Sequence, residues 1–272
     1  MGPVSREALW RYISAGGKPL DGTLAEVFGG QPTINDDDDI DWEEPSPDDD
    51  ESLVSEDDEM AWVSLDSWDI DESSCNTLIT EEMHKAVKEG DYQTVKRLVD
   101  GGADIEARSK YDMPTLQIAA LYGHWKIVQI LIDRGADIAV QGRYEWTALH
   151  SAAIQSYPEV VKVIIDRDIN LELRDRDGQT ALHFAAIGGD CSIIKMLLAR
   201  GADILAADDD GQTVLHIAAM RGPLEAVHIL LDYGADLRAK TRSGSTAYNY
   251  AIVNNNSDIA MVLKGYYRSF KT

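Results

Sequence analysis

From about residue 80 onward, the apolar residues fall into short stretches with helical spacing, and these stretches occur in pairs. Residues 175–207 show the pattern: an alanine-rich stretch around Leu182 is followed by a bulkier stretch that ends at Leu198. Gly189 separates the two stretches. Gly201 follows the second one, where a glycine commonly ends a helix because it accepts the left-handed conformation. The pattern therefore predicts two short helices joined by a tight turn.

This pair of helices recurs every 33 residues. One pair cannot bury its own apolar faces, whereas stacked pairs bury a continuous core. We therefore expect an all-α solenoid of stacked helix-turn-helix units. The triplet Gly-Ala-Asp closes the units at 102–104, 135–137, 201–203 and 234–236, and Asp168-Ile169-Asn170 stands in its place in the third unit. The six units that we predict span about 80–108, 109–141, 142–174, 175–207, 208–240 and 241–272.

Three units share one signature at the start of their first helix. It occurs as Thr147-Ala148-Leu149-His150-x-Ala152-Ala153, Thr180-Ala181-Leu182-His183-x-Ala185-Ala186 and Thr213-Val214-Leu215-His216-x-Ala218-Ala219. This signature resembles the T-P-L-H-x-A-A motif of the ankyrin repeat family, and the resemblance covers about residues 80–264. It implies an ankyrin-repeat solenoid with loop fingers between the units and a concave surface that binds proteins. The first and last units resemble caps, and the third unit, with Ser156-Tyr157-Pro158 in place of the turn glycine, fits least well.

Charge divides the chain at about the same point. Residues 1–80 hold 22 acidic and 3 basic residues, whereas residues 81–272 hold 26 acidic and 22 basic residues. Such an acidic, low-complexity arm, residues 1–79, is expected to be largely disordered, with one short helix near 5–14. The acidity argues against direct nucleic-acid binding and against an anionic membrane surface. No apolar run is long enough to span a membrane, and the first residues lack a secretory signal.

The arm contains a group of large apolar residues among its acids: Trp62, Leu65, Trp68 and Ile70. Acids that alternate with bulky apolar residues are typical of a segment that folds when it binds a partner. These four residues are therefore candidates for a second binding segment. The alternative is that the segment folds back on the repeats as an additional cap.

No set of residues with catalytic spacing is apparent. The histidines in register, among them His150, His183 and His216, lie about one helix-pair width apart, which is too far for shared metal ligation. In the ankyrin family this histidine holds the turn of the neighbouring unit by hydrogen bonds. Nucleophile, phosphate-loop and EF-hand motifs are absent from the sequence. We therefore expect no enzyme activity, no catalytic or metal-binding residues and no cofactor.

The resemblance also indicates which residues would bind a partner, since the variable positions of the family lie at the fingers and just after the Ala-Ala pair. Units two and three supply mostly aromatic and apolar residues there, the types that dominate interface energetics. The candidate positions are Lys110, Tyr111, Met113, Leu121, Tyr122, Arg143, Tyr144, Trp146, Ile154, Gln155, Arg176, Asp177, Gln179, Asp209, Asp210, Met220, Arg221 and Arg242.

These features favour a monomeric, cytoplasmic or nuclear adaptor that binds a protein partner, with the arm as a regulatory or second binding element. One alternative is a transcription-related regulator whose arm acts as an acidic activation-type segment or a nucleic-acid mimic. A more remote alternative is an enzyme or small-molecule binder that uses the groove.

Overall fold

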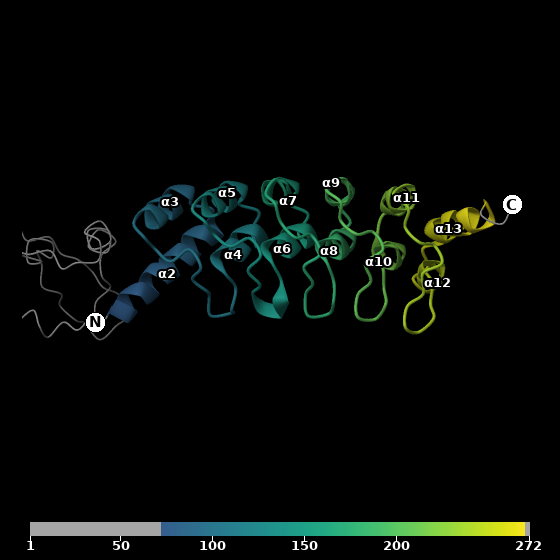
Figure 1. Cartoon of the computed structure of the whole chain (residues 1–272), viewed down its shortest axis with the longest axis horizontal. Helices are drawn as coiled ribbons and strands as arrows, with labels where there is room; N and C mark the ends of the chain where they lie inside the picture. Colours follow the sequence, from purple (N-terminus) through teal and green to yellow (C-terminus); the bar gives the residue numbers. More distant parts are fainter. Residues whose placement is uncertain (1–71, 270–272) are drawn as a thin grey trace, which may run out of the picture. The chain divides into compact units, whose positions relative to one another are not determined.

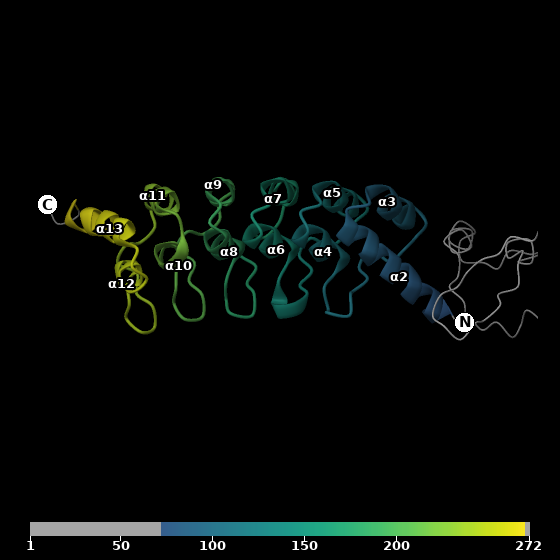
Figure 2. The same ribbon diagram turned by 180° about the vertical axis from the view of Figure 1, so that it is seen from behind.

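The computed structural model describes residues 72–269, and these residues form helices arranged in pairs (Figures 1 and 2). The expected all-α solenoid of stacked pairs is confirmed. The inner layer holds α2 (Glu72–Glu89), α4 (Thr115–Leu121), α6 (Ala148–Ile154), α8 (Ala181–Gly188), α10 (Val214–Arg221) and α12 (Ala247–Val253). The outer layer holds α3 (Tyr92–Asp100), α5 (Trp125–Asp133), α7 (Pro158–Ile165), α9 (Cys191–Ala199), α11 (Leu224–Asp232) and α13 (Ser257–Ser269). The short 3₁₀ helix η3 (Arg143–Glu145) lies in a finger.

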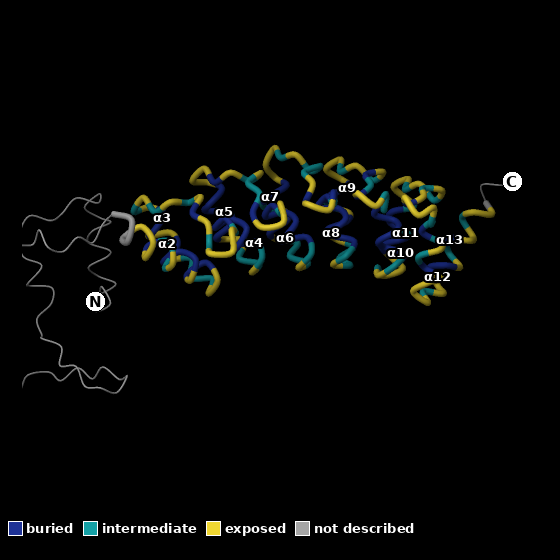
Figure 3. The backbone as a smooth tube through the Cα atoms, turned by 90° about the horizontal axis from the view of Figure 1, so that it is seen from below, coloured by how far each residue is buried: buried dark blue, intermediate teal, exposed yellow. Residues whose placement is uncertain are grey.

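The fingers project from the inner layer on the side away from the outer helices (Figure 1). Buried residues concentrate in the helices, and exposed residues concentrate in the loops (Figure 3). Helix α2 begins at Glu72, ahead of the boundary at residue 80 drawn from the sequence. No helix among residues 72–269 is long and apolar enough to cross a membrane. The helix expected near 5–14 and the segment Trp62, Leu65, Trp68 and Ile70 lie outside the described residues.

Small side chains allow neighbouring inner helices to pack closely. Ala119, Ala152, Ala185 and Ala218 occupy the same position in successive units, and each is fully buried. The outer helices contribute larger apolar side chains, such as Ile193 and Leu197 of α9, which are also fully buried. The core is therefore one continuous strip between the two layers, as the stacking argument requires.

The threonine and histidine of the signature cap the inner helices. In α6 the Thr147 amide donates to His150 Nδ1 at 3.1 Å, and the same bond joins Thr180 to His183. Because Nδ1 accepts this bond, the proton lies on Nε2. His183 Nε2 then donates to the Gln212 carbonyl of the next unit at 3.3 Å, which confirms the structural role expected for these histidines. His150 differs, since among residues 72–269 its buried Nε2 has no partner at hydrogen-bonding distance.

Ion pairs join the outer helices of the first four units. Arg167 pairs with Asp133 at 2.6 Å, and Arg134 with Asp100 and Arg200 with Asp166 repeat the contact one unit away on either side. The side chains remain about half exposed, so each pair contributes little stability alone. Their recurrence at equivalent positions reflects the regular stacking of these units.

A larger side chain at the contact between inner helices should destabilise the stack. Ala185→Leu is expected to lower the free energy of unfolding by about 1–3 kcal/mol because the added atoms overpack a closed contact. The measurement is urea denaturation. Ala199→Leu is the matched control, because Ala199 is exposed on α9 and should tolerate the change. Equal midpoints for the two variants would show that the assigned helix contact is wrong.

Burial of the signature histidines should make stability depend on pH. Desolvation lowers the pKa of His150 from 6.5 to about 4, and burial also lowers the pKa values of His84, His183 and His216. The unfolded chain therefore binds the His150 proton first as the pH falls. Above pH 6.5 the neutral histidines leave the free energy of unfolding at its full value. As the pH falls from 6.5 to 4, that free energy decreases progressively, and His150 accounts for about 3 kcal/mol of the decrease.

His150→Gln is the test, because Gln117 already occupies this position in the second unit. The urea midpoint of the variant should fall less between pH 7.5 and 4.5 than that of the wild-type chain. An identical fall in both proteins would assign the pH dependence to other groups.

Candidate protein-binding surface on the fingers and inner helices

Each finger begins with a residue whose side chain, in most units, organises the turn. Asp175 Oδ1 accepts hydrogen bonds from the amides of Asp177 at 3.0 Å and Gln179 at 2.8 Å. Asp208 does the same one unit later, for Asp210 and Gln212. The turn residue of these two fingers is a glycine in the left-handed conformation, as turn chemistry requires.

Backbone hydrogen bonds tie each finger to the next. The amide of Arg143 donates to the Asp112 carbonyl at 3.0 Å, and the amide of Arg176 donates to the Tyr144 carbonyl at 3.1 Å. The series continues with Asp209 to Asp177 and Arg242 to Asp210. The fingertips therefore form one row with fixed spacing, which makes a preorganised platform.

Side chains at the base of the fingers brace the same row. Arg108 donates to the Gln141 carbonyl at 3.0 Å, Gln141 to the Arg174 carbonyl at 2.8 Å, and Arg174 to the Ala207 carbonyl at 2.8 Å. Each of these residues stands 33 positions after the previous one, so the series is a direct product of the repeat. It ends at Ala207, which has no side-chain donor.

The fingers of units two and three, here the second and third fingers, share a sequence of residue types that the other fingers lack. They carry Lys110-Tyr111-Asp112 and Arg143-Tyr144-Glu145, with the cation, the tyrosine and the acid in the same order. Tyr111 is 51% exposed and Tyr144 is 50% exposed. Lys110 Nζ lies 5.1 Å from the centre of the Tyr111 ring, and Arg143 lies 4.7 Å from that of Tyr144. Each exposed ring therefore has a cation at its face, a contact that contributes about 0.5–1 kcal/mol at exposed sites.

These two fingers also adopt unfavourable backbone conformations. Asp112 and Glu145 occupy the left-handed region, with φ of 59° and 62°, where the later fingers have glycine. Tyr144 has φ 63°, so the third finger holds two consecutive non-glycine residues in this region. Left-handed residues with a side chain cost about 1–2 kcal/mol each. Strain of this kind concentrates at functional positions.

Trp146 serves packing as well as surface chemistry. Its indole nitrogen donates to Asp175 Oδ2 at 3.2 Å, and its ring meets Phe184 edge-on, with 4.7 Å between ring centres. Phe184 also packs edge-on against His150. Sequence reasoning missed Phe184; the available signal was a large aromatic residue directly after the signature histidine.

The 18 binding positions predicted on the repeats are all accessible to solvent. Twelve are exposed: Lys110, Tyr111, Tyr122, Arg143, Tyr144, Gln155, Arg176, Asp177, Asp209, Asp210, Arg221 and Arg242. Six are partly buried: Met113, Leu121, Trp146, Ile154, Gln179 and Met220. They lie on the fingers and on the ends of the inner helices.

Comparison with known proteins identifies the repeat. Residues 83–175, 118–208 and 182–269 match the family described as ankyrin repeats in three copies. The chain belongs to the ankyrin repeat family. Among solved structures, it is similar to the ankyrin repeat domain of Bcl-3, described as a unique member of the IkappaB protein family. That likeness has 30% sequence identity and a TM-score of 0.61, and it covers 67% of this chain and 84% of the Bcl-3 chain. No curated protein matches this chain.

A second aromatic group lies at the turn between the helices of the second ankyrin unit. The rings of Tyr122 and His124 stack in parallel, with centres 6.4 Å apart. Trp125 follows, 44% exposed, with Lys126 Nζ 5.5 Å from its ring centre. Sequence reasoning included Tyr122 but missed Trp125, although a tryptophan at the start of an outer helix was visible. His124 is not free, since its Nε2 is 3.1 Å from the Lys88 carbonyl oxygen.

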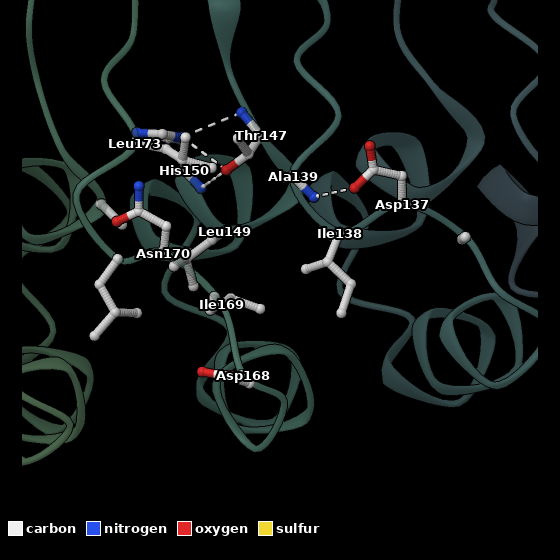
Figure 4. A pocket seen from close by; sticks show the side chains of 13 residues that line it. Asp137, Ile138, Ala139, Thr147, Leu149, His150, Asp168, Ile169, Asn170 and Leu173 are labelled. Atoms are coloured by element: carbon white, nitrogen blue, oxygen red, sulfur yellow. Dashed lines mark hydrogen bonds between the residues drawn. The ribbon is translucent and has the colours of Figure 1, made fainter.

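A pocket of about 310 Å³ lies beside the third ankyrin unit (Figure 4). The unit breaks the repeat here, because Asp168 replaces the left-handed glycine that follows the other outer helices of units one to five. In Figure 4, His150 and Leu173 lie on one side of the pocket, and Ile138 lies on the opposite side. The described residues contain no cluster of three or more potential metal ligands.

Relief of backbone strain in the third finger should stabilise the protein. Glu145→Gly is expected to raise the free energy of unfolding by about 0.5–1 kcal/mol, because glycine accepts the left-handed conformation but loses more conformational freedom on folding. Glu145→Ala removes the same carboxylate and keeps the strain, so it is the matched control. Urea denaturation measures the stability of both variants. A glycine variant that is no more stable than the alanine variant would show that the backbone at position 145 is not strained.

Proposed function

We propose that this ankyrin repeat protein is a non-catalytic adaptor that binds a partner protein through its fingers and inner helices. Ankyrin repeats generally act as protein-binding modules. The observation that carries the proposal is the pair of neighbouring fingers with exposed, cation-held tyrosines, Tyr111 and Tyr144. Tyrosine supplies a large contact area at low entropic cost and is enriched among residues that dominate binding energy.

The arrangement of the fingers indicates that the binding surface is already formed before a partner binds. Because hydrogen bonds fix the fingertip row, little conformational freedom remains to be lost on association. The strained conformations of Tyr144 and Glu145 point in the same direction, since such strain persists only where the surrounding structure holds it. The centre of the proposed interface is therefore the second and third fingers, with Met113 and Trp146 at their base.

The adaptor is favoured over the other candidate functions because its support lies in the described residues. A transcription-related regulator would depend on the acidic arm, and the Bcl-3 likeness concerns the repeats alone. An enzyme or small-molecule binder would use the pocket beside His150, where the Thr147 hydroxyl and His150 already serve to cap α6 and the rest of the lining is mostly aliphatic. We further propose a monomeric, cytoplasmic or nuclear protein whose arm is a regulatory or second binding element.

Removal of the two tyrosines should weaken partner binding. Proteins retained by the full chain are identified by quantitative mass spectrometry, and the affinity of the most enriched one is then measured with purified components. Tyr111→Ala with Tyr144→Ala is expected to weaken that affinity at least tenfold, as is usual for a loss of more than about 1.4 kcal/mol at an aromatic anchor.

Tyr233→Ala is the matched control, because Tyr233 is 49% exposed after the outer helix α11, away from the fingers. It should leave the affinity unchanged. Equal losses in the two proteins, or no protein retained by the wild-type chain, would count against the proposed surface.

A further inference from the structure

The two helices of the sixth unit are the last pair among the described residues, so one face of this pair has no further pair against it (Figures 1 and 2). The earlier units identify that face. Gln117 of α4 donates to Ser151 of the next unit at 3.3 Å, and Ala120 lies one turn later on the same side of the helix. The residues at this position in α4, α6, α8 and α10 are fully buried alanines: Ala120, Ala153, Ala186 and Ala219. Ile252 takes the position in α12 and is 52% exposed.

The outer helix of the sixth unit contributes to the same face. Lys195 of α9 pairs with Glu225 of the next unit at 3.1 Å, so its position faces the following unit. Met261 of α13 takes this position two units later and is 65% exposed. Lys264 lies one turn after Met261 on the same side of the helix and is also exposed. We call Ile252, Met261 and Lys264 the end face.

The end face is not suited to a seventh ankyrin unit. Ile252 is larger than the alanine found at its position in the earlier inner helices, so a further unit would be overpacked there. Lys264 takes the position of Leu198, which is 8% exposed, so a further unit would bury a charge. A capping unit usually presents a polar outer face, which keeps a repeat stack soluble. Ile252 and Met261 break that rule, and Val253, 78% exposed, adjoins Ile252, so the end face has the apolar character of an interaction site.

The surroundings of the end face are basic. Residues 237–269 hold five basic residues and one acid, although the whole chain has a net charge of -23. The five basic residues are all exposed: Arg238, Lys240, Arg242, Lys264 and Arg268. Complementary charge therefore requires that whatever covers the end face is acidic.

Two of these cations occupy positions that reach toward the following unit. Glu172, at the position of Arg238, accepts a hydrogen bond from an amide of the next unit at 2.8 Å. Lys240 is next in the series of finger-base donors that includes Arg174. Helix α13 runs on to Ser269, past the point where the earlier outer helices end. Among the described residues, no closing loop of a sixth unit therefore lies opposite these two cations.

The chain itself is a poor source of an acidic segment for the end face. The bulky residues of the arm, from Trp62 to Ile70, lie within ten residues of Glu72, and ten residues span at most about 36 Å. Five unit spacings of about 8–10 Å lie between the first and last inner helices, or about 40–50 Å. A second copy is disfavoured because each chain carries a net charge of -23, which opposes self-association. A separate protein is the source that fits.

We propose that the end face is a second binding surface, separate from the fingers, for an acidic segment of a partner protein that carries bulky apolar residues. The apolar residues of that segment cover Ile252 and Met261, and its acids meet Lys264 and Arg268. This inference goes beyond the proposed function, because it does not depend on the tyrosine fingers. An adaptor with two separate surfaces can hold two segments at once.

The direct test measures binding of a labelled peptide to the full chain by fluorescence anisotropy. The probe has the sequence of residues 56–71, which combines seven acids and no base with four bulky residues, Trp62, Leu65, Trp68 and Ile70. The control peptide has serine at those four positions. The probe should bind at least tenfold more tightly than the control, and high salt should weaken its binding because the cations are exposed. Equal binding of the two peptides, or no binding of the probe, would overturn the proposal.

Variants with a less apolar end face test the site from the other side. Ile252→Ser with Met261→Ser should weaken binding of the probe about tenfold, because both apolar contacts are lost. Leu205→Ser with Leu224→Ser is the matched control, since these leucines are 57% and 37% exposed on earlier units. Circular dichroism establishes that each variant is folded. Equal losses in the two variants would show that the probe does not bind at the end face.

Reversal of charge tests the ionic part of the same contact. Lys264→Glu with Arg268→Glu should weaken binding of the probe at least tenfold at low salt and less at high salt. Lys126→Glu with Lys162→Glu makes the same change in charge at exposed positions of α5 and α7, and it should have a smaller effect. Equal effects would assign the attraction to the charge of the whole protein and overturn the proposed site.

Two further measurements separate this inference from its neighbours. Tyr111→Ala with Tyr144→Ala should leave binding of the probe unchanged, whether or not the fingers bind a partner of their own. A loss would place the probe on the fingers and overturn the end face as its site. Sedimentation velocity of the full chain should show a monomer, and self-association that Ile252→Ser with Met261→Ser removes would assign the end face to a second copy instead.

Discussion

The close contact between successive inner helices is the constraint on which the rest of this protein depends. Each unit is too small to bury its own apolar faces, so it is stable only against its neighbours. Fully buried alanines, such as Ala152 and Ala185, set the distance at which those neighbours meet. That distance in turn spaces the fingers and brings the carbonyl of one finger within reach of the amide of the next. A surface feature that repeats every 33 residues thereby becomes a regular row in space.

The sequence was sufficient to predict the parts of the structure that follow from this repetition. The helix pairs, the glycines that end them and the capping threonines all occupy fixed positions in the repeat, and each has a local physical reason. Repetition also explains why the candidate binding residues on the repeats are accessible. Positions in the core carry similar residues in every unit, so the positions that vary between units lie on the surface. Residues such as Leu182 and Leu197 could be identified as core residues because an apolar residue recurs at the same position of the repeat every 33 residues.

What the sequence did not predict is the behaviour of residues that break the repeat. Nothing in the tripeptide Arg143-Tyr144-Glu145 indicates two consecutive left-handed residues. In this finger Gly142 stands where Asp175 and Asp208 accept hydrogen bonds in theirs. A Cβ at position 142 would also lie 2.9 Å from the backbone carbonyl oxygen of Asp112, so the neighbouring finger leaves no room for a side chain there. The packing of Trp146 on Phe184 likewise joins two units and cannot be read within either one.

The polar contacts between units are distributed unevenly, and this bears on how the surface works. The series of arginine–aspartate pairs ends at Arg200, because Tyr233 follows in its register, and the series of bonds at the base of the fingers ends at Ala207. Units one to four thus have two sets of cross-unit bonds in addition to the alanine contact, whereas units five and six lack both series. Other contacts join those units: Lys195 pairs with Glu225 at 3.1 Å, and the Asn256 amide nitrogen donates to the Ala219 and Met220 carbonyls at 2.9 and 3.0 Å. The backbone bonds between fingertips continue through the fifth and sixth fingers, so the acidic fifth finger is held in the row by the same kind of bond as the tyrosine fingers, and a partner meets a preformed row.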